Sequence, residues 1–321
     1  MELVFSKVVA IFLLLMTGYV VGRLKLLPED ADTTLTVLLL KVLTPCLILS
    51  SVTSKELNDD TVSATIWTLL GSVGYFAIAA ILGLLFCKYI LRIPRVDVGT
   101  WAFVFGSVNT GFMGFPITLS IFGQDIFFLM VMQNIILGLY LYSVGPILIR
   151  YGNEHIGYEK LSFGGQVKTF LSTLNNPNII MSAVALIMLF CGLHLPDMIF
   201  DSVDLMGNAV VPTSMLLVGI QLSQNDLLEM LKDKRNVLFS VFKMLILPAV
   251  IFLCVNWLPL SNDVKLVLVL SAIFPAAVVT VPVCILEEKD PTDAANLVAL
   301  TTLLSVVTIP IWAVILLHIY A

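Results

Sequence analysis

Long stretches without a charged side chain constrain this sequence more than any other feature. The stretches Thr61–Cys87 and Val98–Gly123 contain no Asp, Glu, Lys or Arg. Each is longer than the roughly 20 residues that cross a hydrocarbon layer about 30 Å thick. Lipid offers no partner to a backbone N–H or C=O, so a segment at that depth satisfies its own hydrogen bonds as a helix. The sequence therefore predicts an all-α protein that crosses a membrane several times.

Composition and hydropathy support the same class of protein. The chain is 59% hydrophobic and 12% charged, whereas about a quarter of the residues of a soluble domain are charged. The apolar residues gather into ten segments, which we predict to be transmembrane helices: Val4–Val21, Thr34–Val52, Val62–Cys87, Val98–Phe122, Ile126–Ile149, Pro177–Leu195, Ser202–Leu222, Asn236–Trp257, Val264–Leu286 and Ala294–Tyr320.

The first segment and the cysteines carry no sign of a signal peptide or a metal site. The first segment has neither a charged n-region nor a small-residue cleavage site before Arg23, so we expect it to be a helix of the mature protein. All five cysteines lie in predicted helices and form no CxxC pair. Reduced, structural thiols are therefore expected, with neither a metal ion nor a cofactor.

The basic residues predict how the chain is oriented. Twelve of the seventeen Lys and Arg residues fall in connections on one side of the predicted helices: Arg23, Lys25, Lys88, Arg92, Arg95, Arg150, Lys160, Lys168, Lys232, Lys234, Arg235 and Lys289. Cytoplasmic connections are the ones enriched in Lys and Arg, so this side is expected to be cytoplasmic. Ten helices then leave both termini outside the cytoplasm. We expect a multi-pass protein of the plasma (cell inner) membrane.

Two halves of the chain share landmarks at an offset of about 166 to 168 residues. The matched pairs are Leu27-Pro28 with Leu195-Pro196, Pro45 with Pro212, Asn109 with Pro275, and Pro116 with Pro282. The landmarks predict a five-helix repeat at 1–150 and another at 176–321, joined by a cytoplasmic loop at 151–175. Because five is odd, the second repeat is inverted, as in many secondary transporters. The alternative is that prolines simply recur in membrane helices.

The fourth and ninth predicted helices contain helix breakers near mid-membrane. Asn109, Gly111 and Pro116 follow one another in the fourth, and Pro275 and Pro282 lie seven residues apart in the ninth. Proline removes a backbone hydrogen bond and clashes with the carbonyl four residues earlier. Unwound backbone at this depth is tolerated where it faces protein or a wet cavity. We therefore predict that both helices are broken and that they cross.

A polar pocket is expected where the two breaks meet. Asn109 offers an amide there, and Thr110 and Thr280 offer hydroxyls. The positive ends of the half-helices favour an anion. The residues predicted to bind it are Asn109, Thr110, Gly111, Pro116, Pro275, Thr280, Pro282 and Lys41. The alternative is a pair of kinked helices whose Asn109 bonds a neighbouring backbone.

Other polar residues near the spans are open to two interpretations. Lys41, one turn before Pro45, either extends to the interface or attracts a carboxylate, whereas Lys243 is expected to extend to the cytoplasmic interface. Gln124, Asp125, Gln133 and Asp290 are candidates for coupling or gating. The alternative is packing for Gln133 and plain solvation for the others.

The stretch Asn109-Thr110-x-x-Met113-Gly114-x-Pro116 resembles a signature of the auxin efflux carrier (PIN-like) family. Leu43-Thr44-Pro45-Cys46-Leu47 and the stretch from Ala209 to Leu222 agree with it. The short 151–175 loop is similar to that of prokaryotic members. The resemblance implies a scaffold of helices 1, 2, 6 and 7, a mobile transport unit of helices 3–5 and 8–10, elevator-type alternating access and a homodimer. It also implies that Asn109 binds the substrate.

The sequence thus predicts a secondary transporter of a small organic anion, either a carboxylate such as malate or malonate or an auxin-like acid. Na⁺, H⁺ or the membrane potential could drive it. The chain has no GxxxxGK[ST] phosphate loop and no GxSxG or HExxH motif, so neither ATP-driven transport nor an enzyme is expected. Nucleic acid is not an expected partner. The alternatives are a sodium- or proton-coupled carrier of the bile-acid-symporter or cation-exchanger type, an intramembrane enzyme and a non-transporting membrane sensor.

Overall fold

In the part of the chain that the structure describes, every regular element is helical. This computed structural model describes residues 2–28, 30–55, 58–151, 177–225 and 230–320. Eight helical segments are long and apolar enough to cross a membrane: Ser6–Arg23, Ala31–Thr53, Asp59–Ile90, Arg95–Phe122, Gln124–Arg150, Asp197–Ser223, Lys234–Asn256 and Thr292–Tyr320. A further apolar helix, α10 (Pro177–Phe190), has 14 residues. The predicted ninth span contains two shorter helices, α16 (Asn262–Ile273) and α17 (Thr280–Leu286).

Several of the long segments contain a π-helical turn, and four of these turns have a common cause. The turns Leu39–Leu43, Thr110–Gly114, Tyr140–Val144 and Phe242–Ile246 each end two residues before a proline. Proline cannot donate a backbone hydrogen bond, and its ring crowds the carbonyl one turn earlier. A widened turn accommodates both effects without ending the helix.

The π-helical turns divide the long segments into consecutive α-helices. The bounds are α2 (Ala31–Leu38), α3 (Thr44–Thr53), α4 (Asp59–Leu85), α5 (Arg95–Gly106), α6 (Phe115–Ile117), α7 (Gln124–Leu139), α8 (Gly145–Arg150), α14 (Lys234–Val241) and α15 (Leu247–Asn256). The helices that carry no such turn are α1 (Glu2–Arg23), α11 (Asp197–Asn208), α12 (Val210–Ser223) and α18 (Thr292–Tyr320).

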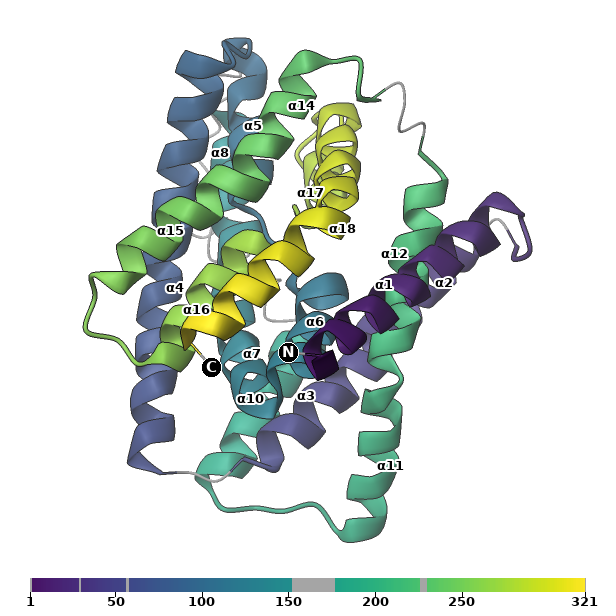
Figure 1. The fold of residues 1–321 in the computed structure, drawn as a ribbon, viewed down its shortest axis with the longest axis vertical. Helices are drawn as coiled ribbons and strands as arrows, with labels where there is room; N and C mark the ends of the chain where they lie inside the picture. The colour runs from purple at the N-terminus through teal and green to yellow at the C-terminus, as the bar shows by residue number, and fades with distance from the viewer. Residues whose placement is uncertain (1, 29, 56–57, 152–176, 226–229, 321) are drawn as a thin grey trace.

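One group of helices is formed by α1, α2, α3, α10, α11 and α12. Helix α1 packs along α12, and α3 packs against α10 and α11 (Figure 1). The contact between α1 and α12 depends on glycine. A Cβ added at Gly18 would lie 2.2 Å from the carbonyl oxygen of Leu216, and one at Gly219 would lie 2.1 Å from that of Leu15. Small residues of this kind let membrane helices approach closely.

The second group contains α4 to α8 and α14 to α18. Helix α4 packs on α5, α7 and α16, while α15 packs on α16. The interior of this group is rich in aromatic rings, and Phe103, Phe105 and Phe239 are fully buried. Helices α5 and α16 lie in the middle of the group, so the middle of the predicted fourth and ninth spans is sheltered from lipid.

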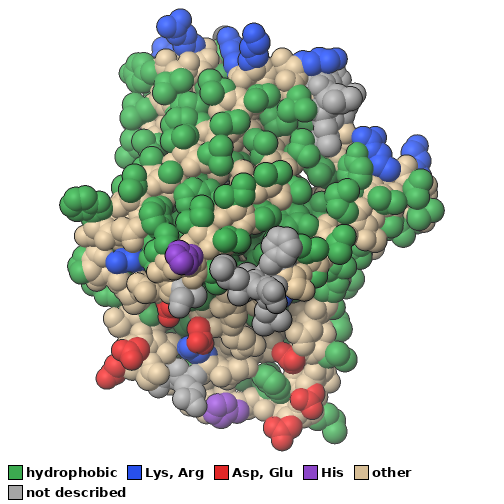
Figure 2. Space-filling model, viewed as in Figure 1, with side chains coloured by type: hydrophobic (Ala, Val, Ile, Leu, Met, Phe, Trp, Pro, Cys, Tyr) green, Lys and Arg blue, Asp and Glu red, His purple; other side chains and the backbone are tan. Residues whose placement is uncertain are grey.

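Charged side chains divide the molecule into two ends. On the face shown in Figure 2, Lys and Arg gather at the upper end, Asp and Glu gather toward the lower end, and hydrophobic side chains lie between them. The upper, basic end includes Lys88, Arg92 and Lys234, and ion pairs there join Arg150 to Glu287 and Lys289 to Asp97. Lys160 and Lys168 lie outside the described residues. This separation agrees with the arrangement that the positions of the basic residues predicted.

Some predicted boundaries are wrong by several residues. The sixth span was expected to reach Leu195, but α10 ends at Phe190. Gly192 follows with a φ of 63°, and Leu193 N–H donates to the carbonyl of Met188 at 2.8 Å. Glycine in this conformation ends a helix. The seventh span was expected to begin at Ser202, but α11 begins at Asp197, directly after Pro196, where proline favours a helix start.

Candidate functional site

The first interruption, residues 107–109, lies between α5 and the π-helical turn that begins at Thr110. Helix α5 ends at Gly106, and Ser107 is extended, with φ −70° and ψ 152°. The next helical segment begins after Asn109, whose side-chain oxygen accepts a hydrogen bond from the Phe112 N–H at 3.2 Å. Asn109 therefore acts as the N-cap of that segment, a position that asparagine favours.

The second interruption, residues 274–279, lies between α16 and α17. Phe274 is extended, with φ −77° and ψ 146°. The Ala276 N–H donates to the Thr301 hydroxyl at 3.2 Å, and the Thr280 hydroxyl donates to the Ala277 carbonyl at 2.7 Å. Side chains thus provide partners for backbone that has left the helix, as burial in a membrane requires.

The two interruptions contact each other directly. The Asn109 N–H donates to the Pro275 carbonyl at 2.8 Å, and the Ala277 N–H donates to the Ser107 hydroxyl at 3.1 Å. Gly114 permits the approach, since a Cβ there would lie 3.2 Å from the ring of Phe274. The prediction that the breaks of the fourth and ninth helices meet is confirmed by these contacts.

Lys243 lies behind the first interruption with its side chain fully buried. Its ammonium donates to the carbonyl oxygens of Phe105 at 2.6 Å and Ser107 at 2.7 Å. These carbonyls are at the C-terminal end of α5, which is the negative end of the helix dipole. No carboxylate pairs with Lys243 in the described part of the chain. The expectation that Lys243 extends to the interface is therefore wrong, because the backbone that α5 frees offers closer partners than water does.

A tyrosine has the corresponding place behind the second interruption. The Tyr75 hydroxyl donates to the Ser271 carbonyl, near the end of α16, at 3.2 Å. Tyr75 and Lys243 are 168 residues apart, which is within the offset of the sequence landmarks. Each side chain thus satisfies a carbonyl that an interrupted helix leaves without its usual partner.

The side-chain amide of Asn109 has an unused donor. The side chain is 3% exposed, its oxygen is taken by Phe112 N–H, and its Nδ2 has no partner among the described residues. Nearby, the Thr110 hydroxyl donates to Gln133 Oε1 at 3.3 Å, and the Gln133 Nε2 also lacks a described partner. A buried donor without an acceptor costs about 1–3 kcal/mol. The pair of unused N–H groups thus favours a guest that accepts hydrogen bonds.

Two cavities reach Asn109. One, of about 210 Å³, extends past Gln221, Gln224 and Asp32, between α12 on one side and α17 and α18 on the other. The second, of about 100 Å³, is lined by Thr110 and Gly111 and by residues of α7 and α10, including Asn134 and Asn178. Both lie between the two groups of helices. A small molecule in either cavity can therefore contact Asn109 and the first group together.

Most of the predicted binding residues meet at the two interruptions. Thr110, Gly111 and Pro275 lie there, and Thr280 is buried at the start of α17. Pro116 is buried within α6, where it explains the π-helical turn before it. Pro282 lies in α17 and is exposed. Lys41 is also exposed and lines neither cavity, so the structure does not bring it to Asn109.

The coupling and gating candidates are scattered. Gln133 adjoins Thr110, whereas Gln124 and Asp125 lie at the acidic end, where Asp125 pairs with Lys55. Asp290 accepts hydrogen bonds from the side chain and the backbone N–H of Thr292, which together lower the pKa of its carboxyl group. Asp290 therefore acts at the start of α18, at the opposite end from Asp125.

Comparison with known proteins gives the family. Residues 3–313 match the family described as membrane transport protein. The chain belongs to this family. The resemblance to auxin efflux carriers is thereby confirmed, and the chain is a multi-pass membrane transporter and not an enzyme.

Two archaeal relatives span most of the chain. One, from Methanocaldococcus jannaschii, is 28% identical over 249 residues, which cover 74% of this chain and 75% of the relative. The other, from Methanothermobacter thermautotrophicus, is 24% identical over 322 residues, covering 97% and 98% of the two chains. Both carry the description uncharacterized transporter, so they support the class of protein and leave its substrate open.

Proposed function

We propose that this membrane transporter is a secondary carrier of a small organic anion and that Asn109 binds the anion. The single observation that carries this proposal is the buried Asn109 Nδ2, which has no partner in the described chain and borders two cavities. A carboxylate oxygen is an acceptor, and a hydrogen bond to a charged group contributes about 1.5–3 kcal/mol. The helical segment that begins at Thr110 has its positive end at the same place.

The ammonium of Lys243 supports an anion and bears on coupling. It adds a positive charge next to the first interruption without a carboxylate to neutralise it in the described chain. In carriers with broken helices, carbonyls at half-helix C-termini are where a coupling cation binds. Here the Phe105 and Ser107 carbonyls hold the lysine instead. We therefore favour transport that needs no cation at this position, over the sodium- or proton-coupled alternative.

The arrangement of the helices favours alternating access of the elevator type. We assign α1, α2, α3, α10, α11 and α12 to a scaffold and the other group to a transport unit. The close glycine contact of α1 with α12 favours a rigid scaffold, and both cavities lie along its boundary with the transport unit. The Lys55–Asp125 ion pair joins the two groups at the acidic end, which suits a state that is open at the basic end.

The inverted repeat and the homodimer belong to the same proposal. The pairs Asn109 with Pro275 and Tyr75 with Lys243 are 166 and 168 residues apart and occupy equivalent places behind and at the interruptions. This equivalence supports two inverted five-helix repeats and ten membrane helices. The homodimer, formed through the scaffold, rests on the family resemblance, and cross-linking of single-cysteine variants in α11 tests it.

Uptake into proteoliposomes tests the function. The purified protein is assayed with labelled malonate, malate and indole-3-acetate, with and without Na⁺ and pH gradients. Asn109→Asp is the informative variant, because a carboxylate can still accept from the Phe112 N–H but has no donor and repels an anion. A second carboxylate at about 4 Å costs about 4 kcal/mol at an effective dielectric constant of about 20. We expect Asn109→Asp to fold and to lose uptake; wild-type rates for the folded variant would refute the proposed site.

A further inference from the structure

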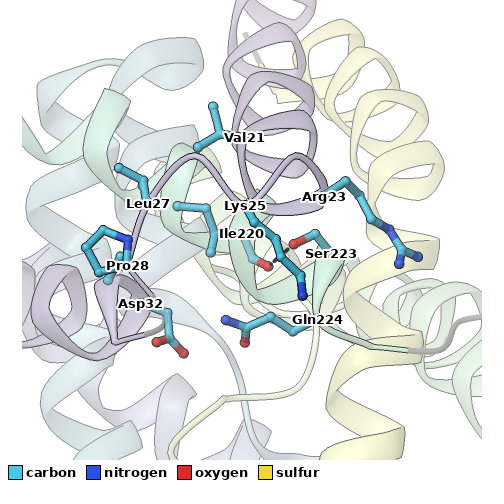
Figure 3. A pocket seen from close by; sticks show the side chains of 11 residues that line it. Val21, Arg23, Lys25, Leu27, Pro28, Asp32, Ile220, Ser223 and Gln224 are labelled. Carbon is cyan, nitrogen blue, oxygen red and sulfur yellow. Dashed lines mark hydrogen bonds between the residues drawn. The ribbon is translucent and has the colours of Figure 1, made fainter.

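The largest cavity adjoining the access route lies at the basic end, beside the loop between α1 and α2. It has a volume of about 430 Å³ and is lined by residues of α1, the loop, the start of α2 and the end of α12 (Figure 3). Two cations, Arg23 and Lys25, belong to its wall, together with the apolar side chains of Val21, Leu27 and Ile220. We refer to this cavity as the basic vestibule.

The basic vestibule is continuous with the cavity that reaches Asn109. Asp32 and Gln224 line both of them. Gln221 and Asn109 lie further along the second cavity. The lining residues therefore trace one route from Arg23 and Lys25, past Asp32 and Gln224, to the unused donor of Asn109.

Lys25 has a backbone conformation that its residue type does not favour. Its φ is 50°, and the N–H groups of Lys25 and Leu26 donate to the carbonyls of Gly22 and Val21 at 3.1 and 3.2 Å. This is the glycine position of a helix C-terminal motif. A side chain there costs about 1 kcal/mol relative to glycine. In Figure 3 the ammonium of Lys25 extends to the same side of the pocket as the amide of Gln224.

The charges of the vestibule favour an anion overall. Arg23 and Lys25 supply two positive charges, and Asp32 supplies one negative charge. The Arg23 side chain donates to the Tyr19 hydroxyl at 3.1 Å, which fixes its position and leaves its charge unopposed by a carboxylate in the described chain. Clefts lined by one sign of charge concentrate ions of the other sign.

We propose that Arg23 and Lys25 make the basic vestibule an anion-collecting site, which concentrates small carboxylates at the basic end and delivers them past Gln224 to Asn109. Asp32 at the neck opposes this attraction and favours onward movement over tight retention. The proposal rests on the proposed function for the identity of the anion. Its electrostatic part depends on the vestibule alone, so that part is measurable without transport.

A cysteine reporter measures the potential of the vestibule. Gln224→Cys is introduced after Cys46, Cys191 and Cys254, the native cysteines that are not buried, have been replaced by serine. The readout is the ratio of modification rates by an anionic and a cationic methanethiosulfonate reagent. We expect Lys25→Gly with Arg23→Gln to lower this ratio about tenfold, and Asp32→Asn to raise it. Both shifts should disappear in 1 M salt, where charges are screened within about 3 Å.

Arg92→Gly is the matched control. Arg92 is a basic residue with a φ of 52° and lies outside the vestibule lining, so its replacement removes the same charge and the same backbone strain. It should leave the ratio at the reporter thiol unchanged, and equal effects of Lys25→Gly and Arg92→Gly would overturn the proposal. Because glycine suits both positions, neither variant is expected to impair folding.

Two further arms separate the alternatives. In vesicles of phosphatidylcholine with phosphatidylglycerol, protection of the reporter thiol from both reagents, compared with phosphatidylcholine alone, would assign the cavity to a lipid headgroup and overturn the proposal. In uptake assays from the basic end, Lys25→Gly should raise the KM for malonate about tenfold with an unchanged maximal rate. A shift in the reagent ratio in a protein that transports none of the anions would support the vestibule and reject the proposed function alone.

Discussion

Replacement of Lys243 by methionine isolates the contribution of the buried ammonium. Methionine has a similar length and fits an apolar surrounding, so the change removes the two hydrogen bonds to Phe105 and Ser107 with little change in volume. The Phe105 and Ser107 carbonyls are then left without the lysine. Asn109 lies two residues beyond Ser107, and its own N–H is bonded to the second interruption. Movement of Ser107 is therefore transmitted to the amide that faces the cavities.

The effect on stability is expected to be small because two contributions oppose each other. Two unpaired buried carbonyls cost about 1–3 kcal/mol each. Removal of the buried ammonium recovers a desolvation penalty of several kcal/mol. We expect the free energy of unfolding to change by less than about 2 kcal/mol, whereas uptake of the anion falls at least tenfold, equivalent to about 1.4 kcal/mol at the site.

The assay compares thermal unfolding in detergent with uptake into proteoliposomes for wild type, Lys243→Met and Lys243→Gln. The glutamine variant retains a donor but no charge, so it separates the hydrogen bonds from the charge. We expect both variants to fold, with Lys243→Gln intermediate in uptake. Wild-type uptake by folded Lys243→Met would refute the argument that this lysine positions the first interruption and favours the anion.

Three further predictions concern other parts of the molecule. Gly219→Val should destabilise the fold by at least about 3 kcal/mol in thermal unfolding, because its Cβ would meet the Leu15 carbonyl, whereas Gly74→Val, where a Cβ meets nothing within 4 Å, should be tolerated. Asp125→Asn removes the pair with Lys55, which is 25% exposed, and should shift the balance of inward and outward states, read by cysteine accessibility, by at most about fivefold; a larger shift would mean that Asp125 does more than pair. Hydrogen bonds from Thr292 lower the pKa of Asp290 below 3.8, so its contribution to stability is present at neutral pH and is lost as the pH falls through that lowered value; the difference in unfolding temperature between wild type and Asp290→Ala should therefore shrink between pH 7 and about pH 3, and a constant difference would contradict this.

The sequence was sufficient for the class of fold because hydropathy acts over whole segments. Eight of the predicted spans correspond to helices long enough to cross a membrane. The breakers in the fourth and ninth spans were informative because Asn109, Pro275 and Gly111 act on the backbone locally. Their meeting could be inferred only from the repeated spacing, and the hydrogen bond of Asn109 to Pro275 agrees with it.

The two lysines within predicted spans show where pattern reasoning fails. Lys41 and Lys243 each lie four or five residues before a proline and look alike in the sequence. In the structure Lys41 is exposed and Lys243 is fully buried. The difference comes from which face of each helix meets the end of α5, and helical periodicity does not specify that in a helix that is apolar all round. The 168-residue spacing from Tyr75 to Lys243 is the signal that could have found the residues behind the interruptions.

Ser107 was missed for a related reason. It carries the hydroxyl that accepts from Ala277 N–H and the carbonyl that accepts from Lys243. A serine between a glycine and a valine in a membrane helix has many neutral explanations, such as bonding its own helix one turn back. Only the three-dimensional contact with the second interruption distinguishes it.

An experimentally determined structure of the wild-type protein with a bound substrate anion tests the central claim most directly. The quantity to measure is the distance from Asn109 Nδ2 to the nearest carboxylate oxygen. The proposed site predicts a hydrogen bond of about 2.7–3.2 Å, with the Asn109 N–H still donating to Pro275. An anion bound elsewhere, with the Asn109 amide satisfied by the protein itself, would contradict the account.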